Sequence, residues 1–452
     1  MLERWFFCNL AACKNKHIDS IMWKTGKKLP LVLTGVVLTV LTLASSCNKD
    51  MFAEDAYENL VKNANPIDSL DAGHQWNLLQ SKVAVVIPNV PGLDDVAQVQ
   101  VLNGNPYDGS ASAEVMGLHT AKAGERTAVA YRFGKSQPQL YAAVVTSAGK
   151  YYVKAFTTGD GDVSFDRGNV ISQGVFHKPK SQTYTYIYET SFPLPDDFDF
   201  NDVVLRLSME TPSDTLLRLK VTLVAVGTLE QMAAAVRLPG VKSDQVKSVT
   251  IEEGNEFDDG FTFQRAMLPS EETLMSSRSD EAVIRLFEDA HWSMSPRTEE
   301  MGGVRRRYYN TEISSRQGYS AKTSAKMRTY DIVFKDGFKA TNLELADMDP
   351  FVVHGYNGGM FEVHIHRYKL AEVIWGYTSG DPNAYNDHMA WALLIPDDSF
   401  KYPIEGTPLG TYRNGLLAGA YSLYRHSFGE WGRNQYVATD WWLHPNYGYY
   451  VD

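Results

Sequence analysis

Cysteine is scarce in this chain of 452 residues, which contains three. Cys8 and Cys13 lie within the first 21 residues, and Cys47 follows an apolar stretch. Residues 1–21 fit no targeting pattern, so we expect translation to begin at Met22. A chain processed at Cys47 holds no thiol apart from that residue, which excludes disulfides, thiol catalysis and thiolate metal sites. Its stability must therefore come from packing.

Sequence signatures of enzymes are also missing. The chain has no Gly-x-Ser-x-Gly turn, no phosphate-binding loop and no Gly-x-Gly-x-x-Gly segment after an expected strand. Aspartate and glutamate are too numerous for a pair of them to indicate glycosidase chemistry. We therefore predict that the chain is not an enzyme. The alternative from another class is a secreted hydrolase that acts on glycans, or a carbohydrate-binding module.

Basic residues are fewer than acidic ones. The chain has 43 lysine and arginine residues against 54 aspartate and glutamate residues, and its formal net charge is -11. Residues 1–46 carry six basic and two acidic side chains, so their removal would bring the net charge to -15. A charge of this sign disfavours binding to nucleic acid or to an anionic membrane surface and favours binding of cations.

One long apolar stretch lies near the N-terminus. A basic segment from Met22 to Lys28 precedes an apolar run from Leu29 to Ala44, and Ser45-Ser46-Cys47 follows. The run is shorter than the ~20 residues that a spanning helix needs, and it is typical of a signal peptide. The end of this segment resembles a lipobox, which implies cleavage before Cys47 and a diacylglycerol and acyl anchor on it. The alternative is a plain signal peptide in which Cys47 is incidental.

Short strands separated by turns predict the fold of the remainder. In Leu217–Leu223, leucine and valine alternate with polar residues, as in a half-buried antiparallel strand. We predict an all-β protein with two antiparallel, jelly-roll-like β-sandwich domains and few short helices. Short helices are expected after Thr228 and over Glu281–Ala290. The expected segments are a signal peptide (22–46), a flexible tether (47–72), a small β-sandwich (73–156), a linker (157–182) and a second β-domain (183–452) with a surface insertion (270–305).

Several ordered segments resemble the LruC domain family. They are Tyr188–Leu205, Leu238-Pro239-Gly240-Val241, Trp391–Pro396, Phe400–Glu405, Tyr421–Trp431 and Asp440–Pro445. His74–Leu78 resembles the start of the β-domain that often precedes an LruC domain. The resemblance covers about residues 184–445. It implies a β-rich surface lipoprotein of a Gram-negative bacterium without enzymatic activity. Asn48 after the lipid site is not the aspartate that commonly retains lipoproteins at the inner membrane, so the resemblance implies the outer membrane.

The acidic segment before an expected strand is the main candidate site. If residues 197–201 are extended, Phe198 and Phe200 share one face and the oxygen-bearing side chains share the other. Calcium takes six to eight oxygen ligands, and loops with such side chains suit it. We therefore predict a calcium site made by Asp197, Asp199, Asn201 and Asp202. The alternative is a turn in which aspartate and asparagine bond to the backbone.

Two weaker patterns remain open. Glu362, His364 and His366 fall on one face of an expected strand and could bind zinc, but an exposed polar strand face has the same spacing. Aromatic residues near the C-terminus could stack on sugars or could form a core. They are Trp431, Trp441, Trp442, Tyr447, Tyr449 and Tyr450. We expect a lipid-anchored envelope protein that binds a glycan or a protein at the cell surface.

Overall fold

The computed structural model describes two β-domains, and Cys47 with the segment expected to be a signal peptide lies outside the described residues. The described residues are 65–451, except 110–112, 138, 167, 169, 191–195, 253–256, 258–265, 295–306, 312–319, 357–358, 366–376 and 379–388. Within them, no helix is long and apolar enough to span a membrane.

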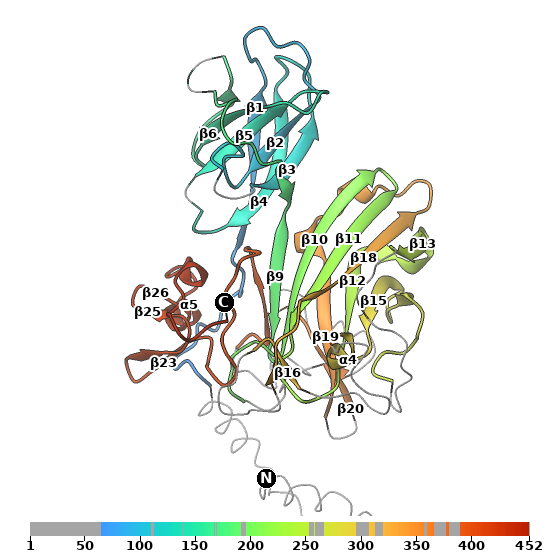
Figure 1. Cartoon of the computed structure of the whole chain (residues 1–452), viewed down its shortest axis with the longest axis vertical. Coiled ribbons are helices and arrows are strands. Elements are labelled where there is room, and N and C mark those ends of the chain that lie inside the picture. Colours follow the sequence, from blue (N-terminus) through green and yellow to red (C-terminus); the bar gives the residue numbers. More distant parts are fainter. Residues whose placement is uncertain are drawn as a thin grey trace, which may run out of the picture. The chain divides into compact units, whose positions relative to one another are not determined.

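The small domain consists of two sheets. A three-stranded sheet has the order β4-β1-β7, and a five-stranded sheet has the order β6-β5-β2-β3-β8 (Figure 1). The strands are β1 (Leu79–Ile87), β2 (Gln98–Leu102), β3 (Glu114–Thr120), β4 (Thr127–Gly134), β5 (Leu140–Val145), β6 (Tyr151–Phe156), β7 (Val163–Ser164) and β8 (Lys180–Ser181). Residues from both sheets, among them Val86, Val99 and Val129, form one core. The segment 157–182, which we expected to be a linker, contributes β7 and β8 to these sheets.

The large domain has two six-stranded sheets. The first large sheet is ordered β13-β18-β11-β10-β9-β22, and the second large sheet is ordered β14-β15-β12-β19-β20-β21. The first contains β9 (Thr183–Tyr188), β10 (Val203–Ser213), β11 (Leu216–Ala225), β13 (Val246–Ile251), β18 (Lys326–Phe334) and β22 (Ala392–Ile395). The second contains β12 (Met232–Lys242), β14 (Leu274–Ser276), β15 (Glu281–Phe287), β19 (Asp349–Tyr356), β20 (Gly359–Val363) and β21 (Tyr377–Thr378). Together they confirm the all-β fold class.

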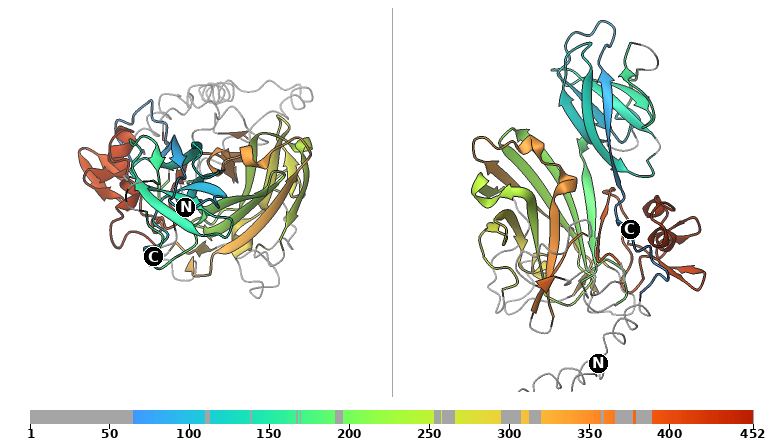
Figure 2. Two further views of the ribbon diagram at one scale, coloured as in Figure 1. Left: turned by 90° about the horizontal axis from the view of Figure 1, so that it is seen from above. Right: turned by 180° about the vertical axis from the view of Figure 1, so that it is seen from behind.

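The main core lies between these two sheets. Leu217, Leu219 and Val221 of β11 are fully buried in it, as their alternation with polar residues predicted. Ala234 and Val236 of β12 enter the same core from the second large sheet. Figure 2 shows the strands of both sheets around this common interior. Residues of β9 and β10 that point away from this core, such as Ile187 and Val204, belong to a second cluster.

Two parts of the second large sheet correct the sequence analysis. The segment after Thr228 forms strand β12, and Glu281–Phe287 forms strand β15, where we expected helices. Val283 and Ile284 are both fully buried, because Ile284 packs in the main core and Val283 packs in a separate cluster with Met267 and Phe351. A strand that is buried on both faces loses the alternation that identifies strands, and its apolar run resembles a buried helix. The surface insertion expected at 270–305 is therefore wrong for β14 and β15.

A second, aromatic core lies on the other face of the first large sheet. Ile187 of β9 and Val204 of β10 pack there against aromatic residues from the C-terminal region. That region contains β23 (Thr411–Arg413), β24 (Leu416–Ala418), β25 (Ser422–Leu423), β26 (His426–Ser427), α5 (Phe428–Arg433) and η4 (Trp441–Leu443). The remaining short elements are η1 (Ser243–Gln245), α4 (Ala290–Met294), β16 (Tyr308–Tyr309), β17 (Ser320–Ala321), η2 (Ala340–Asn342) and η3 (Leu345–Asp347).

The residues that precede β1 also belong to this aromatic core. Ile67 and Trp76 are 2% exposed, and the Trp76 ring meets Trp431 edge to face at 5.4 Å. The amide of Asp68 donates to the Tyr412 carbonyl of β23. The described end of the expected flexible tether, residues 65–72, is therefore docked on the C-terminal region. Sequence reasoning missed this because the partners lie more than 300 residues away.

Candidate metal centre

The candidate centre lies where β9 ends and β10 begins. These strands are antiparallel neighbours, and Tyr188 pairs with Val203. The residue after β9, Glu189, is therefore brought to the acidic segment that leads into β10. The Glu189 amide donates to the Trp391 carbonyl next to β22, which fixes its backbone.

The backbone of the acidic segment is not extended, contrary to our expectation. Phe198 has φ 55° and Phe200 has φ 57°, which is the left-handed region. Both phenylalanine side chains are nevertheless buried in the aromatic core, at 3% and 0% exposed. The Phe198 ring packs on Trp391 at 5.5 Å, and the Phe200 ring packs on Phe428 at 6.2 Å. Burial of two large side chains offsets the cost of this conformation.

Three carboxylates converge in this segment. One oxygen from each of Glu189, Asp197 and Asp199 lies within 4.8 Å of the others. Glu189 and Asp199 are 1% exposed, and Asp197 is half-buried. Oxygen ligands at such separations suit a hard cation such as calcium. We call these three residues the carboxylate cluster.

Asp199 is held by two backbone hydrogen bonds. Its Oδ1 accepts from the Asn201 amide at 3.0 Å, and its Oδ2 accepts from the Gly406 amide at 2.8 Å. The first bond is the turn that we weighed as the alternative to a metal site. A carboxylate oxygen has two lone pairs, so these bonds leave acceptor capacity on both oxygens. The turn and a bound cation are compatible.

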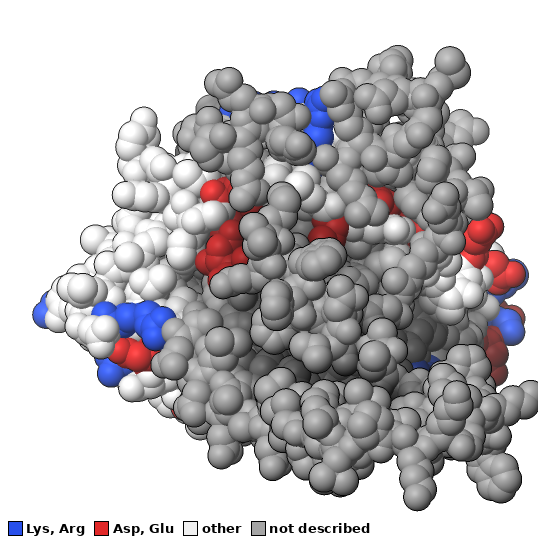
Figure 3. All heavy atoms as spheres, turned by 90° about the horizontal axis from the view of Figure 1, so that it is seen from below, with Lys and Arg blue, Asp and Glu red and all other residues white. Residues whose placement is uncertain are grey.

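The electrostatic surroundings of Asp199 are acidic. Burial raises the pKa of the Asp199 carboxyl well above its usual value, and the carboxylates of Asp197, Glu189, Glu405 and Asp202 raise it further. Each of these effects disfavours the negative form of Asp199. A divalent cation would reverse them, because it neutralises the charges that face Asp199. The view from below shows acidic side chains above the middle of the visible face and also at its edges, and lysine and arginine mainly toward the edges (Figure 3).

The other two predicted ligands make different contacts. Asn201 donates from Nδ2 to the Pro403 carbonyl at 3.1 Å, and its Oδ1 lies against Gly227, where a Cβ atom would clash with it. Asp202 accepts from the Thr190 amide at 2.6 Å and from the Thr190 hydroxyl at 2.9 Å. Burial raises the Asp202 pKa to about 7 although these bonds oppose the shift. The structure thus places two of the four predicted ligands in the carboxylate cluster and adds Glu189.

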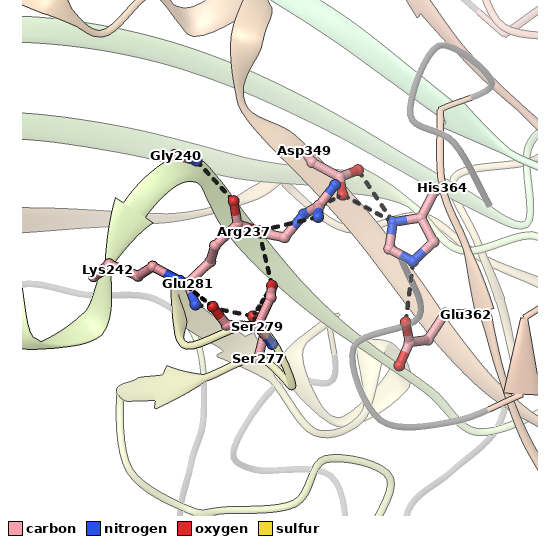
Figure 4. A network of polar contacts seen from close by, with 9 residues as sticks. All are labelled: Arg237, Gly240, Lys242, Ser277, Ser279, Glu281, Asp349, Glu362 and His364. Carbon is pink, nitrogen blue, oxygen red and sulfur yellow. Dashed lines mark hydrogen bonds and ion pairs between the residues drawn. The ribbon is translucent and has the colours of Figure 1, made fainter. Parts of the chain in front are cut away.

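The structure describes two of the three residues of the possible zinc pattern. His364 and Glu362 are buried, and His366 lies outside the described residues. His364 Nδ1 lies 3.0 Å from Asp349 Oδ2, and its Nε2 lies 3.1 Å from Glu362 Oε2 (Figure 4). Arg237 Nε donates to the same Asp349 oxygen at 3.0 Å. Because both ring nitrogens of His364 face carboxylates, these residues form a buried ion network and no exposed strand face.

The C-terminal aromatics are divided between core and surface. Trp431 and Trp441 are fully buried in the aromatic core, and Trp442 is 5% exposed. Tyr447 and Tyr449 are exposed. The tryptophans are therefore part of the packing, and the two tyrosines are available for contacts with a ligand.

Comparison with known proteins assigns this all-β chain to a family. Residues 215–441, half of the chain, match the family described as a domain of unknown function (DUF4842). The chain belongs to this family. The match begins in β11, so it includes Glu405 and Gly406 but not the carboxylate cluster. No curated protein matches the sequence.

A solved structure aligns with most of this chain. It is the crystal structure of a Bacteroides ovatus protein that is provisionally described as a lipoprotein. The alignment covers 79% of this chain and 99% of that one, with 13% sequence identity and a TM-score of 0.44.

Proposed function

We propose that this DUF4842 protein is lipid-anchored in the bacterial envelope and has a non-catalytic binding or structural role that depends on calcium. The carboxylate cluster is the observation that carries the proposal, since Glu189, Asp197 and Asp199 bring three acidic side chains together in a mostly buried site. Calcium binds through oxygen ligands, and its two positive charges would compensate this arrangement.

A calcium ion in this position would connect three segments of the chain. Glu189 follows β9, Asp197 and Asp199 precede β10, and Asp199 accepts a hydrogen bond from the Gly406 amide. The ion would therefore link a loop of the C-terminal half, through Asp199, to the end of β9 and the start of β10. Three carboxylates supply at most six oxygen atoms, and water or backbone carbonyls complete the coordination that calcium requires.

The lipid anchor and the envelope location are supported by the N-terminal sequence. The basic segment, the apolar run and Ser45-Ser46-Cys47 follow one another as in lipoprotein signals. We further propose that the LruC resemblance over residues 184–445 reflects kinship, since that range contains the DUF4842 match. Kinship with LruC proteins would place this protein at the outer membrane, facing a glycan or protein ligand.

The hydrolase alternative fits the carboxylate cluster less well. Retaining glycosidases separate their two carboxyl groups by about 5–5.5 Å and inverting ones by about 6.5–9.5 Å, with room for substrate between them. Here the oxygen atoms lie within 4.8 Å of one another, and Glu189 and Asp199 are 1% exposed. Side chains buried this deeply are poorly placed to contact a sugar ring. We therefore expect no turnover of glycosides, esters or peptides.

The calcium proposal is tested by thermal unfolding of the full-length protein in detergent. A ligand that binds the native state alone stabilises it by ~2.7 kcal/mol at one hundred times its dissociation constant. The melting temperature should rise in millimolar calcium and fall in excess chelator. Asp199→Asn and Glu189→Gln should each remove most of this response. An identical wild-type melting temperature in calcium and in chelator would contradict the proposal.

Two further variants sharpen this test. Glu125→Gln changes an exposed carboxylate outside the cluster and should leave the calcium response intact. Asp202→Asn keeps an oxygen that can accept from Thr190 while it removes the charge. If Asp202→Asn retains the response and Asp199→Asn loses it, the ligands are those of the carboxylate cluster. If both lose it, the calcium ion also depends on Asp202.

A further inference from the structure

A second group of potential metal ligands lies in the C-terminal region. His426 Nδ1 is 2.7 Å from Asp440 Oδ2, and His444 Nε2 is 3.1 Å from the same oxygen. One ligand atom from each of these three residues lies within 4.8 Å of the others. The two imidazole rings are adjacent, with their centroids 4.2 Å apart. We call these residues the histidine site.

Short, well-anchored elements position the two histidines. His426 lies in β26, directly before helix α5. Ser427 caps this helix, since its Oγ accepts from the Glu430 amide and donates to Glu430 Oε2. The same Glu430 oxygen accepts from the Arg425 amide on the other side of His426. The backbone of His426 is thus held from both sides.

Asp440 and His444 flank the 3₁₀-helix η4. They are four residues apart, and the His444 amide donates to the Trp441 carbonyl. Trp441 is fully buried against Phe428 of α5, with ring centroids 5.1 Å apart. One aromatic core therefore carries all three ligands, and a site on rigid elements keeps its geometry without a ligand present.

The chemistry of the histidine site differs from that of the buried ion network. Each ring directs one nitrogen to a single carboxylate oxygen, whereas His364 directs both nitrogens to carboxylates. The site also lies at the surface, because the side chains of His426, His444 and Asp440 are 39%, 33% and 24% exposed. Asp440 forms a hydrogen bond with one nitrogen of each ring. Such bonds could be made to either carboxylate oxygen, whereas here both histidines contact the same one, Oδ2.

Two imidazoles and one carboxylate form a ligand set for zinc. Zinc bonds to histidine nitrogen at about 2.0–2.1 Å and to carboxylate oxygen at about 2.0–2.2 Å. Tetrahedral ligands at these bond lengths lie roughly 3.3–3.5 Å apart. For a metal to enter, the distance of 2.7 Å would need to open by about 0.6–0.8 Å and the distance of 3.1 Å by about 0.2–0.4 Å. Nitrogen ligands disfavour calcium, so the site is distinct in chemistry from the carboxylate cluster.

We infer that His426 Nδ1, His444 Nε2 and Asp440 Oδ2 bind a divalent transition-metal ion, with zinc as the ion that this ligand set fits. The partial exposure of all three side chains leaves the fourth position to water or to a group from a binding partner. Three protein ligands and one open position are the arrangement that lets zinc accept an external ligand. The metal would also cross-link β26 to η4 across the C-terminal region.

The inference is tested with the full-length protein, purified through a tag without histidine. Zn²⁺ titrated by calorimetry should bind with a stoichiometry of one, and Co²⁺ should show the visible absorption of a four- or five-coordinate ion. His426→Ala and His444→Ala should each weaken Zn²⁺ binding at least about tenfold and abolish the Co²⁺ spectrum. Asp440→Asn, which keeps an acceptor for both histidines, should weaken binding because it removes the charge.

Controls separate the histidine site from general effects. His119→Ala removes an exposed histidine on β3 and should leave both metal signals unchanged. Asp199→Asn should also leave them unchanged, so that failure of the calcium proposal leaves this inference standing. Metal-free melting temperatures of the three site variants would show that the fold is retained. If Zn²⁺ affinity and the Co²⁺ spectrum are the same in the wild type and in the His426→Ala, His444→Ala double variant, the inference is wrong.

Discussion

His364 is a buried histidine whose pKa is set by its neighbours. Burial lowers its pKa, but Asp349 and Glu362 raise it more, and the net result is about 9. The raised value means that the folded state binds a proton that the unfolded chain releases above pH ~6.5. The stability that this proton contributes is complete below pH ~6.5 and is lost as the pH rises through about 9.

We predict that the pH dependence of stability changes in His364→Gln. The free energy of unfolding of the wild type should fall relative to the variant between pH 6.5 and 9.5, by up to about 3 kcal/mol. Urea unfolding at several pH values measures the difference. His119→Gln, which changes an exposed histidine, should follow the wild type. Parallel curves for the wild type and His364→Gln would show that the network does not hold this proton.

At the same scale, sequence reasoning found two of the three residues of the carboxylate cluster. Asp197 and Asp199 are near in sequence to a recognisable strand, and the burial of Phe198 and Phe200 supports the predicted pattern. Glu189 was missed because its place depends on the pairing of β9 with β10. An antiparallel pairing assumed across this short connection would have brought Glu189 to the acidic segment.

At the scale of elements, strands with one exposed face could be predicted from the sequence, and strands buried on both faces could not. Strand β11 has one buried face and alternates clearly, so its sequence identified it. The run Met232–Val236 of β12 is fully buried and has no alternation, and the same holds for Ala282–Ile284 of β15. Such runs do not distinguish a central strand from a helix, and the residues that cover both faces of these strands come from distant parts of the chain.

The docking of residues 65–78 on the C-terminal region gives a prediction at this scale. Trp76→Ala should lower the free energy of unfolding by about 3–5 kcal/mol, because it empties a well-packed aromatic site beside Trp431. Hydrogen exchange should rise at the amides of Asp68 and Tyr412, which the docked segment protects. Tyr436→Ala removes an exposed ring and should have little effect. Unchanged stability and exchange in Trp76→Ala would mean that the segment docks without this ring.

For the whole molecule, the pattern of short strands and turns predicted the fold class and composition gave a negative net charge, but neither identified the partner. An excess of 11 acidic side chains is a property of the chain as a whole. It favours solubility and cation binding without specifying where a cation binds. The two candidate metal sites depend on contacts between β9 and β10 and between β26 and η4. Only the folded molecule brings those residues together.

The predicted lipid anchor concerns the whole molecule, because it would attach the entire folded chain to a membrane. Growth with a fatty-acid probe should label the protein, since Cys47 follows a basic segment, an apolar run and two serines. Cys47→Ala should abolish the label and release the protein from the membrane fraction. Cys8→Ala and Cys13→Ala should be labelled as the wild type is, because both residues precede Met22. A label that persists in Cys47→Ala would show that the chain is not anchored at this cysteine.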